Sequence, residues 1–240
     1  MSRVSRLNYF AAVAAFSCAA VCASATPALP EDVPNHYYGL VAQDLHDFHG
    51  GIHGAFASRN VKSDAIKAEI DTSRINAYLG YDLTRMFTVY ALGGVLSVDC
   101  DKIGADDWSS AWGAGLWARL VDDDSLDFLP TISRFRLNCG VEYLYSDAAD
   151  LKWNEVNGFL TFEIMNENLL NNEFFPGAVS LFFGPVFTYV DLDEYEQVSN
   201  NNWGFTLGGA FMFGKASFAN VGIDIFNDDN CGYFTAGVRF

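Results

Sequence analysis

Apolar and polar side chains alternate with a period of two over most of the chain beyond residue 50. The clearest example is the stretch 132–147, where Phe135, Leu137 and Val141 share one face while Arg134 and Glu142 lie on the other. Successive side chains of a β-strand point to opposite faces, so this period indicates strands with one apolar and one polar face. No segment shows the 3.6-residue period of a long amphipathic helix.

The alternation recurs in about ten segments, separated by short turn-rich stretches. They are 51–60, 68–82, 86–99, 107–121, 132–146, 151–165, 178–191, 203–213, 216–226 and 231–240. A tilted strand needs about 9 to 11 residues to cross a bilayer, and single-chain bacterial barrels carry an even number of antiparallel strands. The pattern therefore predicts an all-β fold, a closed antiparallel up-and-down transmembrane β-barrel of about ten strands, with eight possible.

A soluble secreted lipocalin-like barrel also alternates, but its apolar face points inward. Here the polar faces also carry small residues, which suit a confined lumen, and this favours the membrane barrel. They are Gly113, Gly115, Gly140, Gly158, Gly208 and Gly237. Pro185 lies within a predicted strand, where it removes a donor from the ladder, and we expect a β-bulge there.

The beginning of the chain has the features of a secretory signal peptide. Arg3 and Arg6 precede an apolar run over 11–23, which ends in Ala23-Ser24-Ala25. We therefore expect residues 1–25 to be a signal peptide, 26–49 an irregular periplasmic segment and 50–240 the barrel.

Charge and motifs exclude several functions. The 30 Asp and Glu residues outnumber the 14 Lys and Arg residues, giving a net charge of -16, which argues against nucleic acid as a partner. No motif of a catalytic, metal or cofactor site is present, so we expect neither enzymatic activity nor a cofactor. His46, His49 and His53 have a spacing that invites a metal site, but Gly50-Gly51 interrupts it, and we favour polar residues at the periplasmic mouth.

The predicted register turns charged residues of both signs into the lumen. Unpaired ions are costly in a confined interior, so these residues should form charge-assisted pairs that brace the wall. The predicted lumen network consists of Arg74, Arg119, Arg134, Arg136, Glu142, Glu155, Glu163, Asp224 and Arg239.

Aromatic residues gather near both ends of the predicted apolar faces, as in the interfacial girdles of barrels in lipid. One predicted girdle contains Trp108, Tyr145, Tyr189 and Trp203, and the other contains Tyr81, Phe135, Phe211 and Phe213.

Taken together, the signal peptide, the stretch 78–94 (YLGYDLTRMFTVYALGG) and the closing Gly237-Val238-Arg239-Phe240 resemble the small outer-membrane β-barrel, porin-like and opacity-type superfamily of Gram-negative bacteria. The resemblance covers about residues 50–240. It implies an outer-membrane location and a monomer in contact with membrane lipid and lipopolysaccharide. It also implies recognition by the barrel-assembly machinery through Phe234, Ala236, Val238 and Phe240.

We expect an envelope-structural or narrow-pore role of limited diffusion. A surface recognition barrel of the adhesin type, binding ligands through its extracellular loops, is the alternative. Acidic residues gather in the predicted extracellular loops, around 99–107, 147–150, 191–196 and 228–229, as a rim that would attract cations. Cys100 and Cys231 lie at the same rim, so a disulfide between them stays open.

Overall fold

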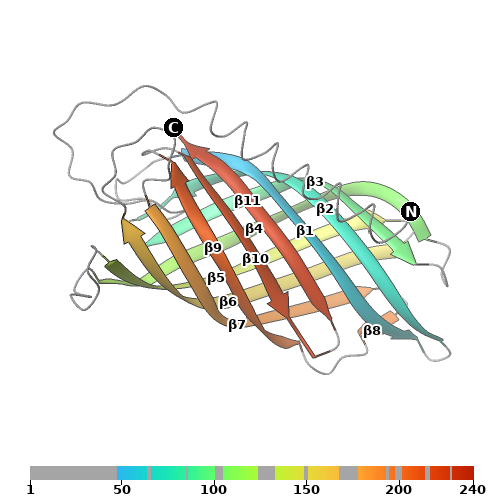
Figure 1. Cartoon of the computed structure of the whole chain (residues 1–240). Helices are drawn as coiled ribbons and strands as arrows, with labels where there is room; N and C mark the ends of the chain where they lie inside the picture. The colour runs from blue at the N-terminus through green and yellow to red at the C-terminus, as the bar shows by residue number, and fades with distance from the viewer. Residues whose placement is uncertain are drawn as a thin grey trace.

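The computed structural model describes residues 48–63, 66–84, 86–100, 105–123, 133–148, 151–167, 178–192, 195–197, 202–213, 217–227 and 229–240. Within these residues the chain is all β-strand and turn (Figure 1). The strands are β1 Phe48–Ser63, β2 Ile66–Asp82, β3 Phe87–Cys100, β4 Ala105–Asp123, β5 Ser133–Ala148, β6 Leu151–Glu167, β7 Ala178–Leu192, β8 Tyr195–Gln197, β9 Trp203–Phe213, β10 Ser217–Ile225 and β11 Asn230–Arg239. The predicted signal peptide and His46 lie outside the described residues, and β1 begins two residues before the predicted barrel boundary.

Ten long strands form one closed antiparallel sheet in the described part of the chain. Each long strand pairs with its neighbours in the order of the sequence, and β11 returns to pair with β1, for example through Gly51 and Gly237. This closure leaves no free edge among the long strands, and it confirms the predicted ten-stranded up-and-down barrel.

The short strand β8 is an addition to this ring. It pairs with the end of β7 through Leu192 and Tyr195, and with the end of β1 through Val61 and Gln197. Because β9, β10 and β11 are shorter than β1 and β7, β8 joins those two strands beyond the ends of the short ones.

The two ends of the barrel are distinct. The end where Phe48 and Phe240 lie, with the hairpin from β2 to β3, is called the terminal end below. The opposite end, which carries β8 and the connection from β10 to β11, is called the distal end. In Figure 1 the terminal end is at the left and β8 lies at the distal end on the lower right.

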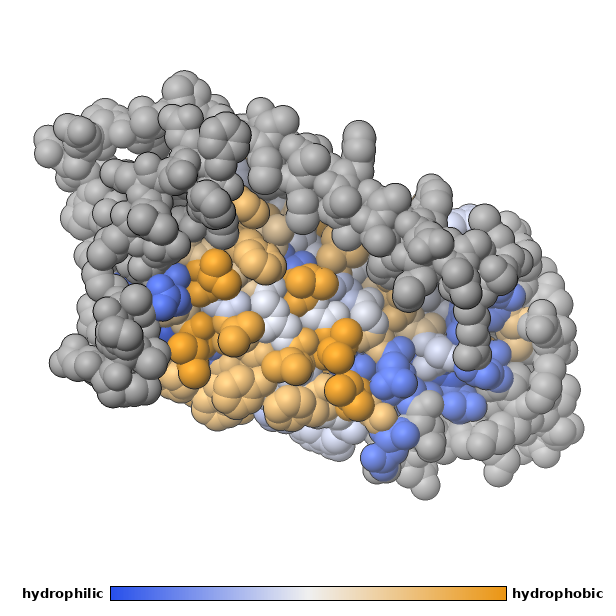
Figure 2. Space-filling model, viewed as in Figure 1, coloured by the Kyte–Doolittle hydropathy of each residue, from blue (hydrophilic) through white to orange (hydrophobic). Residues whose placement is uncertain are grey.

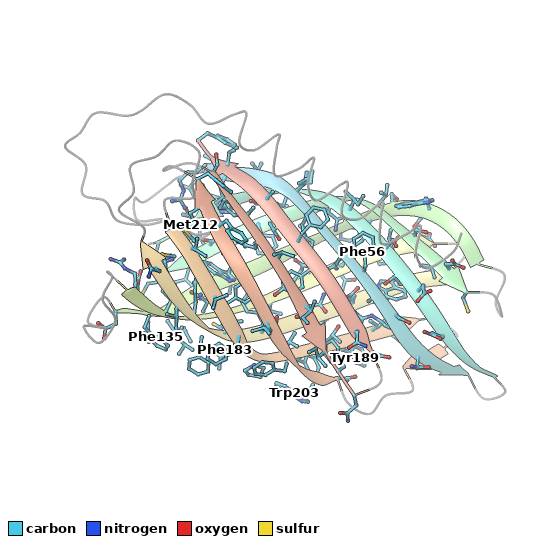
Figure 3. The ribbon with its side chains drawn as sticks, in the orientation of Figure 1. Phe56, Phe135, Phe183, Tyr189, Trp203 and Met212 are labelled. Atoms are coloured by element: carbon cyan, nitrogen blue, oxygen red, sulfur yellow. The ribbon has the colours of Figure 1, made fainter. Side chains whose placement is uncertain are left out.

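Apolar side chains cover the outside of the barrel. Leu79, Leu181, Leu207 and Val221 lie within strands and are about half exposed or more. Figure 2 shows orange residues gathered over the middle of the visible face, with the blue ones toward its ends. On the same outer surface, Phe135, Phe162, Phe183 and Phe205 from four neighbouring strands follow one another with ring centroids 5.9 to 6.3 Å apart (Figure 3).

One β-bulge interrupts the alternation, and it lies in β4. Arg119 pairs with Asn138, but Val121 pairs with Leu137, so Leu120 is an extra residue. The bulge reverses the faces of the residues that follow: Leu120 and Val121 are both exposed outside, and the Asp122 side chain turns toward the lumen.

The bulge predicted at Pro185 is wrong. Pairing between β6 and β7 lapses at Gly184 and Pro185, but it resumes in unchanged register, from Phe159 opposite Val186 to Phe162 opposite Phe183. The proline lacks the donor that would complete the ladder, and the strand passes this gap without an additional residue.

Candidate functional site

The distal part of the lumen is filled by apolar side chains. Eight inward-facing residues, all almost completely buried, form one cluster contributed by six neighbouring strands, β2 to β7. They are Ile70, Leu96, Val98, Cys100, Ala111, Leu144, Trp153 and Val190. This set is called the distal apolar layer below.

An ionic bridge crosses the lumen below this layer. Arg74 from β2 reaches the opposite wall, where its Nη2 lies 3.2 Å from Glu142 Oε1 on β5 and its Nη1 lies 3.8 Å from Glu155 Oε2 on β6. Arg59 from β1 places its Nη2 2.9 Å from Glu155 Oε1. The exposed fraction of these four side chains is at most 11%. The four are called the ionic crossbar below.

Neutral groups hold the crossbar in place. Glu155 also accepts hydrogen bonds from Trp153 Nε1 at 3.0 Å and from Asn157 Nδ2 at 2.9 Å. Glu142 accepts one from the Tyr90 hydroxyl at 3.1 Å. A carboxylate that receives several donors is fixed in orientation and stabilised in its charged form.

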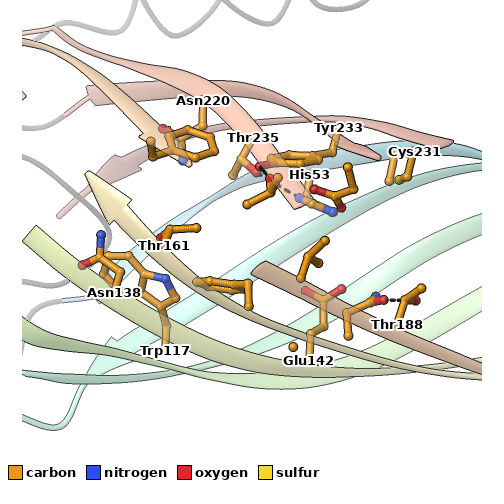
Figure 4. Close-up of a pocket in the computed structure, with 18 of the residues that line it drawn as sticks. His53, Trp117, Asn138, Glu142, Thr161, Thr188, Asn220, Cys231, Tyr233 and Thr235 are labelled. Atoms are coloured by element: carbon orange, nitrogen blue, oxygen red, sulfur yellow. Dashed lines mark hydrogen bonds between the residues drawn. The ribbon is translucent and has the colours of Figure 1, made fainter. Parts of the chain in front are cut away.

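Between the crossbar and the terminal end lies a cavity of about 230 Å³ (Figure 4). Seven Phe, Tyr and Trp rings line it, among them Tyr78 and Phe226, and the other five each stand directly opposite a glycine of the neighbouring strand. The pairs are Tyr90 with Gly115, Trp117 and Phe159 with Gly140, Phe182 with Gly208, and Tyr233 with Gly222.

The glycines make room for the rings. A Cβ atom on Gly115 would lie 2.2 Å from Tyr90 Cζ, and one on Gly222 would lie 2.5 Å from Tyr233 Cζ. Gly140 and Gly208 show the same close approach to Phe159 and Phe182. The rings therefore pack against the barrel wall at the glycines, which leaves space for the cavity between them.

Three arginines converge on one carboxylate at the terminal end. Asp122 lies 2.7 Å from Arg119 Nη1, 3.3 Å from Arg136 Nε and 3.5 Å from Arg134 Nη1. The bulge at Leu120 directs Asp122 into this position. The three guanidinium groups are almost completely buried, so the shared carboxylate offsets part of their desolvation.

A second contact at the terminal end joins β11, the last strand, to the end of β2. Asp82, at the end of β2, accepts from Arg239 Nη2 at 3.0 Å and from the Thr88 hydroxyl, and His49 Nε2 lies 3.7 Å away. His53 is separate from His49: its Nδ1 lies 2.9 Å from Thr235 Oγ1 and its Nε2 lies 3.3 Å from Arg74 Nη2. The described histidines thus do not converge, and no metal-binding group of three or more ligands occurs in the described part of the chain.

The nine residues of the predicted lumen network all lie on the inner face, where they divide into several groups. Arg74, Glu142 and Glu155 belong to the crossbar, Arg119, Arg134 and Arg136 surround Asp122, and Arg239 contacts Asp82. Glu163 accepts from Asn138 and Ser180, and Asp224 lines the cavity.

The predicted girdle residues point outward, near the two ends of the barrel. Those near the distal end are Trp108, Tyr145, Tyr189 and Trp203, and those near the terminal end are Tyr81, Phe135, Phe211 and Phe213. Figure 3 shows Phe135, Tyr189 and Trp203 pointing away from the barrel axis. Within the predicted assembly signal, Phe240 is 71% exposed, but Phe234 and Ala236 are buried. The Phe234 ring occupies the space where Gly54, its partner on β1, would carry a Cβ.

Sequence reasoning missed Arg59, Asp122 and most of the distal apolar layer. Arg59 lies in a segment rich in Gly and Ala with weak alternation, and Asp122 follows a bulge that a strict period of two cannot reveal. Leu96, Val98 and Leu144 are apolar residues on the inner face, where the alternation predicts polar ones. The signal that was present lies in the second half of β3, where Leu96, Val98 and Cys100 alternate with the polar residues Ser97 and Asp99.

Two further expectations need correction. Cys100 and Cys231 are free thiols, so the disulfide that the sequence left open does not form in this structure. Asp229, assigned to the acidic rim, is buried and accepts a hydrogen bond from the Asn60 backbone N–H at 3.0 Å. It tethers the connection between β10 and β11 to β1 rather than adding to the exposed charge.

The fold and the site together define a class. A closed barrel with half-exposed leucines and valines outside and buried ion pairs inside reverses the arrangement of a soluble barrel. The described residues contain no helix that is long and apolar enough to cross a membrane. The chain is a transmembrane β-barrel of the kind found in outer membranes, in which closure of the sheet lets the strands pair their backbone polar groups with one another.

No protein-family model matches the chain, and no curated protein matches it. Several solved structures are similar. An outer membrane channel from Pseudomonas putida F1 aligns over 89% of this chain and 98% of its own, with 11% identity and a TM-score of 0.40. The translocator domain of autotransporter NalP from Neisseria meningitidis covers 83% and 90%, with 9% identity and a TM-score of 0.41. Outer membrane protein AlkL covers 88% and 97%, with 11% identity and a TM-score of 0.36. At these scores the class assignment rests on the geometry of the barrel itself.

Proposed function

We propose that the protein is an outer-membrane barrel with an envelope-structural role, whose lumen is closed to the bulk flow of ions. Its terminal end would face the periplasm and its distal end the exterior. Membrane lipid and lipopolysaccharide would surround it, and the barrel-assembly machinery would insert it. We also predict that the protein is a monomer and that it has no enzymatic activity.

The observation that supports a closed lumen is the distal apolar layer. Ile70, Leu144 and Trp153 have no measurable exposure, although each points inward from a different strand. A hydrated ion would have to lose its water to pass such a layer, at a large cost in free energy. The crossbar of Arg59, Arg74, Glu142 and Glu155 adds a second obstruction directly below it.

The width of the barrel agrees with this proposal. Barrels of about eight strands are filled by their own side chains, and open aqueous channels occur at about 16 strands. A ten-stranded barrel lies near the filled limit, and here large side chains such as Trp153 and the two arginines occupy the interior. The alternative is a narrow pore for limited diffusion, which the following experiment distinguishes from a closed lumen.

The test is single-channel recording in planar bilayers with purified, refolded protein. The wild type should give no reproducible conductance steps. A variant that removes both obstructions, carrying Leu144→Ala, Trp153→Ala, Arg59→Ser and Glu155→Ser, should give them. Tyr143→Ala changes a neighbouring lipid-facing side chain and should stay silent.

Gel mobility before and after boiling checks that each variant is folded, because a closed barrel migrates differently from the unfolded chain. Reproducible steps from folded wild-type protein would overturn the closed-lumen proposal in favour of a narrow pore. Protein that appears in the periplasmic wash, without a shift on boiling, would overturn the outer-membrane assignment.

A further inference from the structure

The cavity between the ionic crossbar and the terminal end has the properties of a binding site. We infer that it binds a small organic cation that carries an amine N–H group and an apolar or aromatic body. This inference goes beyond the proposed structural role, because it holds whether or not the lumen conducts ions.

The first argument is the aromatic lining. Tyr90, Trp117, Phe159, Phe182 and Tyr233 line the space and come from five strands. Figure 4 shows Trp117 and Tyr233 on different strands of the cavity wall. Phe182 and Tyr233 are stacked, with centroids 6.5 Å apart and planes inclined by 25°. Ring faces carry partial negative charge, and a cation near several of them is stabilised electrostatically, more so when it is desolvated.

The second argument is the charge of the lining. Its ionic side chains are the two guanidinium groups of Arg59 and Arg74 and four carboxylates, so the carboxylates exceed the guanidinium groups by two. The carboxylates belong to Glu142, Glu155, Glu163 and Asp224. Both arginines already contact carboxylates in the crossbar, and Arg119, near Glu163, contacts Asp122 at 2.7 Å. Among the side chains that line the cavity, negative charge is therefore in excess, which favours a cation. Arg136, opposite Glu163 on the neighbouring strand, lies outside this lining and shares Asp122 with Arg119 and Arg134.

The third argument is an acceptor without a donor. Asn138 is 3% exposed and lines the cavity, and its Nδ2 donates to Glu163 Oε2 at 2.9 Å. This bond fixes the amide orientation, because a carboxylate can only accept. Asn138 Oδ1 is then left without a hydrogen-bond partner among the described residues. A buried acceptor of this kind is costly unless a ligand or a water molecule donates to it.

The size of the cavity limits the ligand. About 230 Å³ is less than the 300 to 1,000 Å³ typical of pockets for drug-sized molecules. A single substituted ring with one amine is a suitable probe, and we choose benzylammonium. Benzyl alcohol and benzoate have nearly the same shape and replace the cation by a neutral group and an anion.

The experiment is isothermal titration of the refolded barrel in detergent micelles with each of the three probes. A parallel series has the probe present during refolding and counts the retained molecules by equilibrium dialysis, which covers slow entry into a closed lumen. Benzylammonium should bind with one molecule per barrel, at least tenfold more tightly than benzyl alcohol, and benzoate should not bind.

Matched variants locate the site. Ala210 lines the cavity, so Ala210→Phe should fill it and abolish binding. Ala91→Phe makes the same change on the lipid face of β3 and should leave binding unchanged. Asn138→Ala should weaken benzylammonium binding at least fivefold. The mobility shift on boiling shows that each variant is folded.

Three results would overturn the inference. One is the absence of benzylammonium binding in both series, which would mean that the cavity holds only water. Another is equal affinity for benzyl alcohol, which would reduce the cavity to a site for neutral apolar molecules. The third is unchanged binding in folded Ala210→Phe, which would place the probe in the micelle or on the outer surface.

Discussion

Arg239, next to the end of the chain, donates from Nη2 to Oδ2 of Asp82 at 3.0 Å and so ties the closing strand β11 to the end of β2 across β1. Asp82 has no measurable exposure, and it also accepts a hydrogen bond from Thr88 on β3. The contact therefore joins three parts of the wall next to the seam where the barrel closes.

Replacement of Asp82 should destabilise this seam. We expect Asp82→Ala to lower the free energy of unfolding by about 3 kcal/mol, because the partly buried Arg239 guanidinium loses a carboxylate partner and the buried Thr88 hydroxyl loses its acceptor. The measurement is the urea midpoint of the folded band on unheated gels. Asp147→Ala removes an exposed carboxylate and serves as the control, with little expected change. Equal midpoints for the two variants would show that the seam does not depend on this pair.

The ionic crossbar predicts a second effect on stability. Glu155→Gln should cost about 3 kcal/mol, because the guanidinium groups of Arg59 and Arg74 lose the charge of a shared carboxylate. Equilibrium unfolding in urea, followed by tryptophan fluorescence, gives the change. Glu69→Gln alters an exposed carboxylate that accepts a hydrogen bond from the Ser58 hydroxyl, and it should be nearly neutral. A wild-type midpoint for folded Glu155→Gln would contradict the assignment of a bracing role to the crossbar.

Because aromatic rings pack over some glycines and not over others, replacement by alanine should destabilise the barrel at one glycine and be tolerated at another. Gly115→Ala places a methyl group in the space of the Tyr90 ring and should destabilise the barrel by about 1 to 3 kcal/mol. Gly93→Ala is the matched control, since a Cβ there meets no atom within 4 Å, and it should be neutral or slightly stabilising.

A double variant separates crowding from other causes. In Tyr90→Ala the ring is gone, so adding Gly115→Ala to that background should cost much less than in the wild type. The unfolding midpoints of the four proteins form a double-mutant cycle. Additive costs would mean that the ring and the glycine are not coupled.

The cysteines predict the absence of a mass change. Because Cys100, Cys139 and Cys231 are free, intact-mass spectrometry of the oxidised and reduced protein should give the same value. Alkylation with iodoacetamide should be faster after unfolding, because Cys100 and Cys231 are buried in the folded barrel. A loss of two protons in the unreduced sample would restore the disulfide that the sequence left open.

Much of the barrel could be predicted from alternation alone, because a period of two determines which side chains share a face. Arg134, Arg136 and Glu142 were assigned to the lumen in this way, and they lie there. The pairing of these residues could not be predicted, since it depends on the register between strands. Arg74 contacts Glu142 across the lumen and not on a neighbouring strand. The local sequence of neither strand indicates that these two side chains meet.

The interior was harder to predict where it departs from a purely polar lining. Leu96, Val98 and Leu144 belong to an apolar layer on the inner face, where the alternation predicts polar residues. The cavity depends on five aromatic residues that each lie opposite a glycine of the neighbouring strand. These pairs can be identified only when the register between the strands is known. The inward orientation of Asp122 depends on one inserted residue, which the periodicity treats as an irregularity.

That inserted residue, Leu120, determines which face of β4 each of the following side chains occupies. Deleting it would send Val121 to the inside and present the Asp122 carboxylate to hydrocarbon, while Arg119, Arg134 and Arg136 would lose the anion that they share. A single-codon deletion here would thus exchange the inner and outer surfaces of every position between it and the end of β4. The charge balance of this end of the barrel depends on how many residues the strand contains as much as on which residues they are.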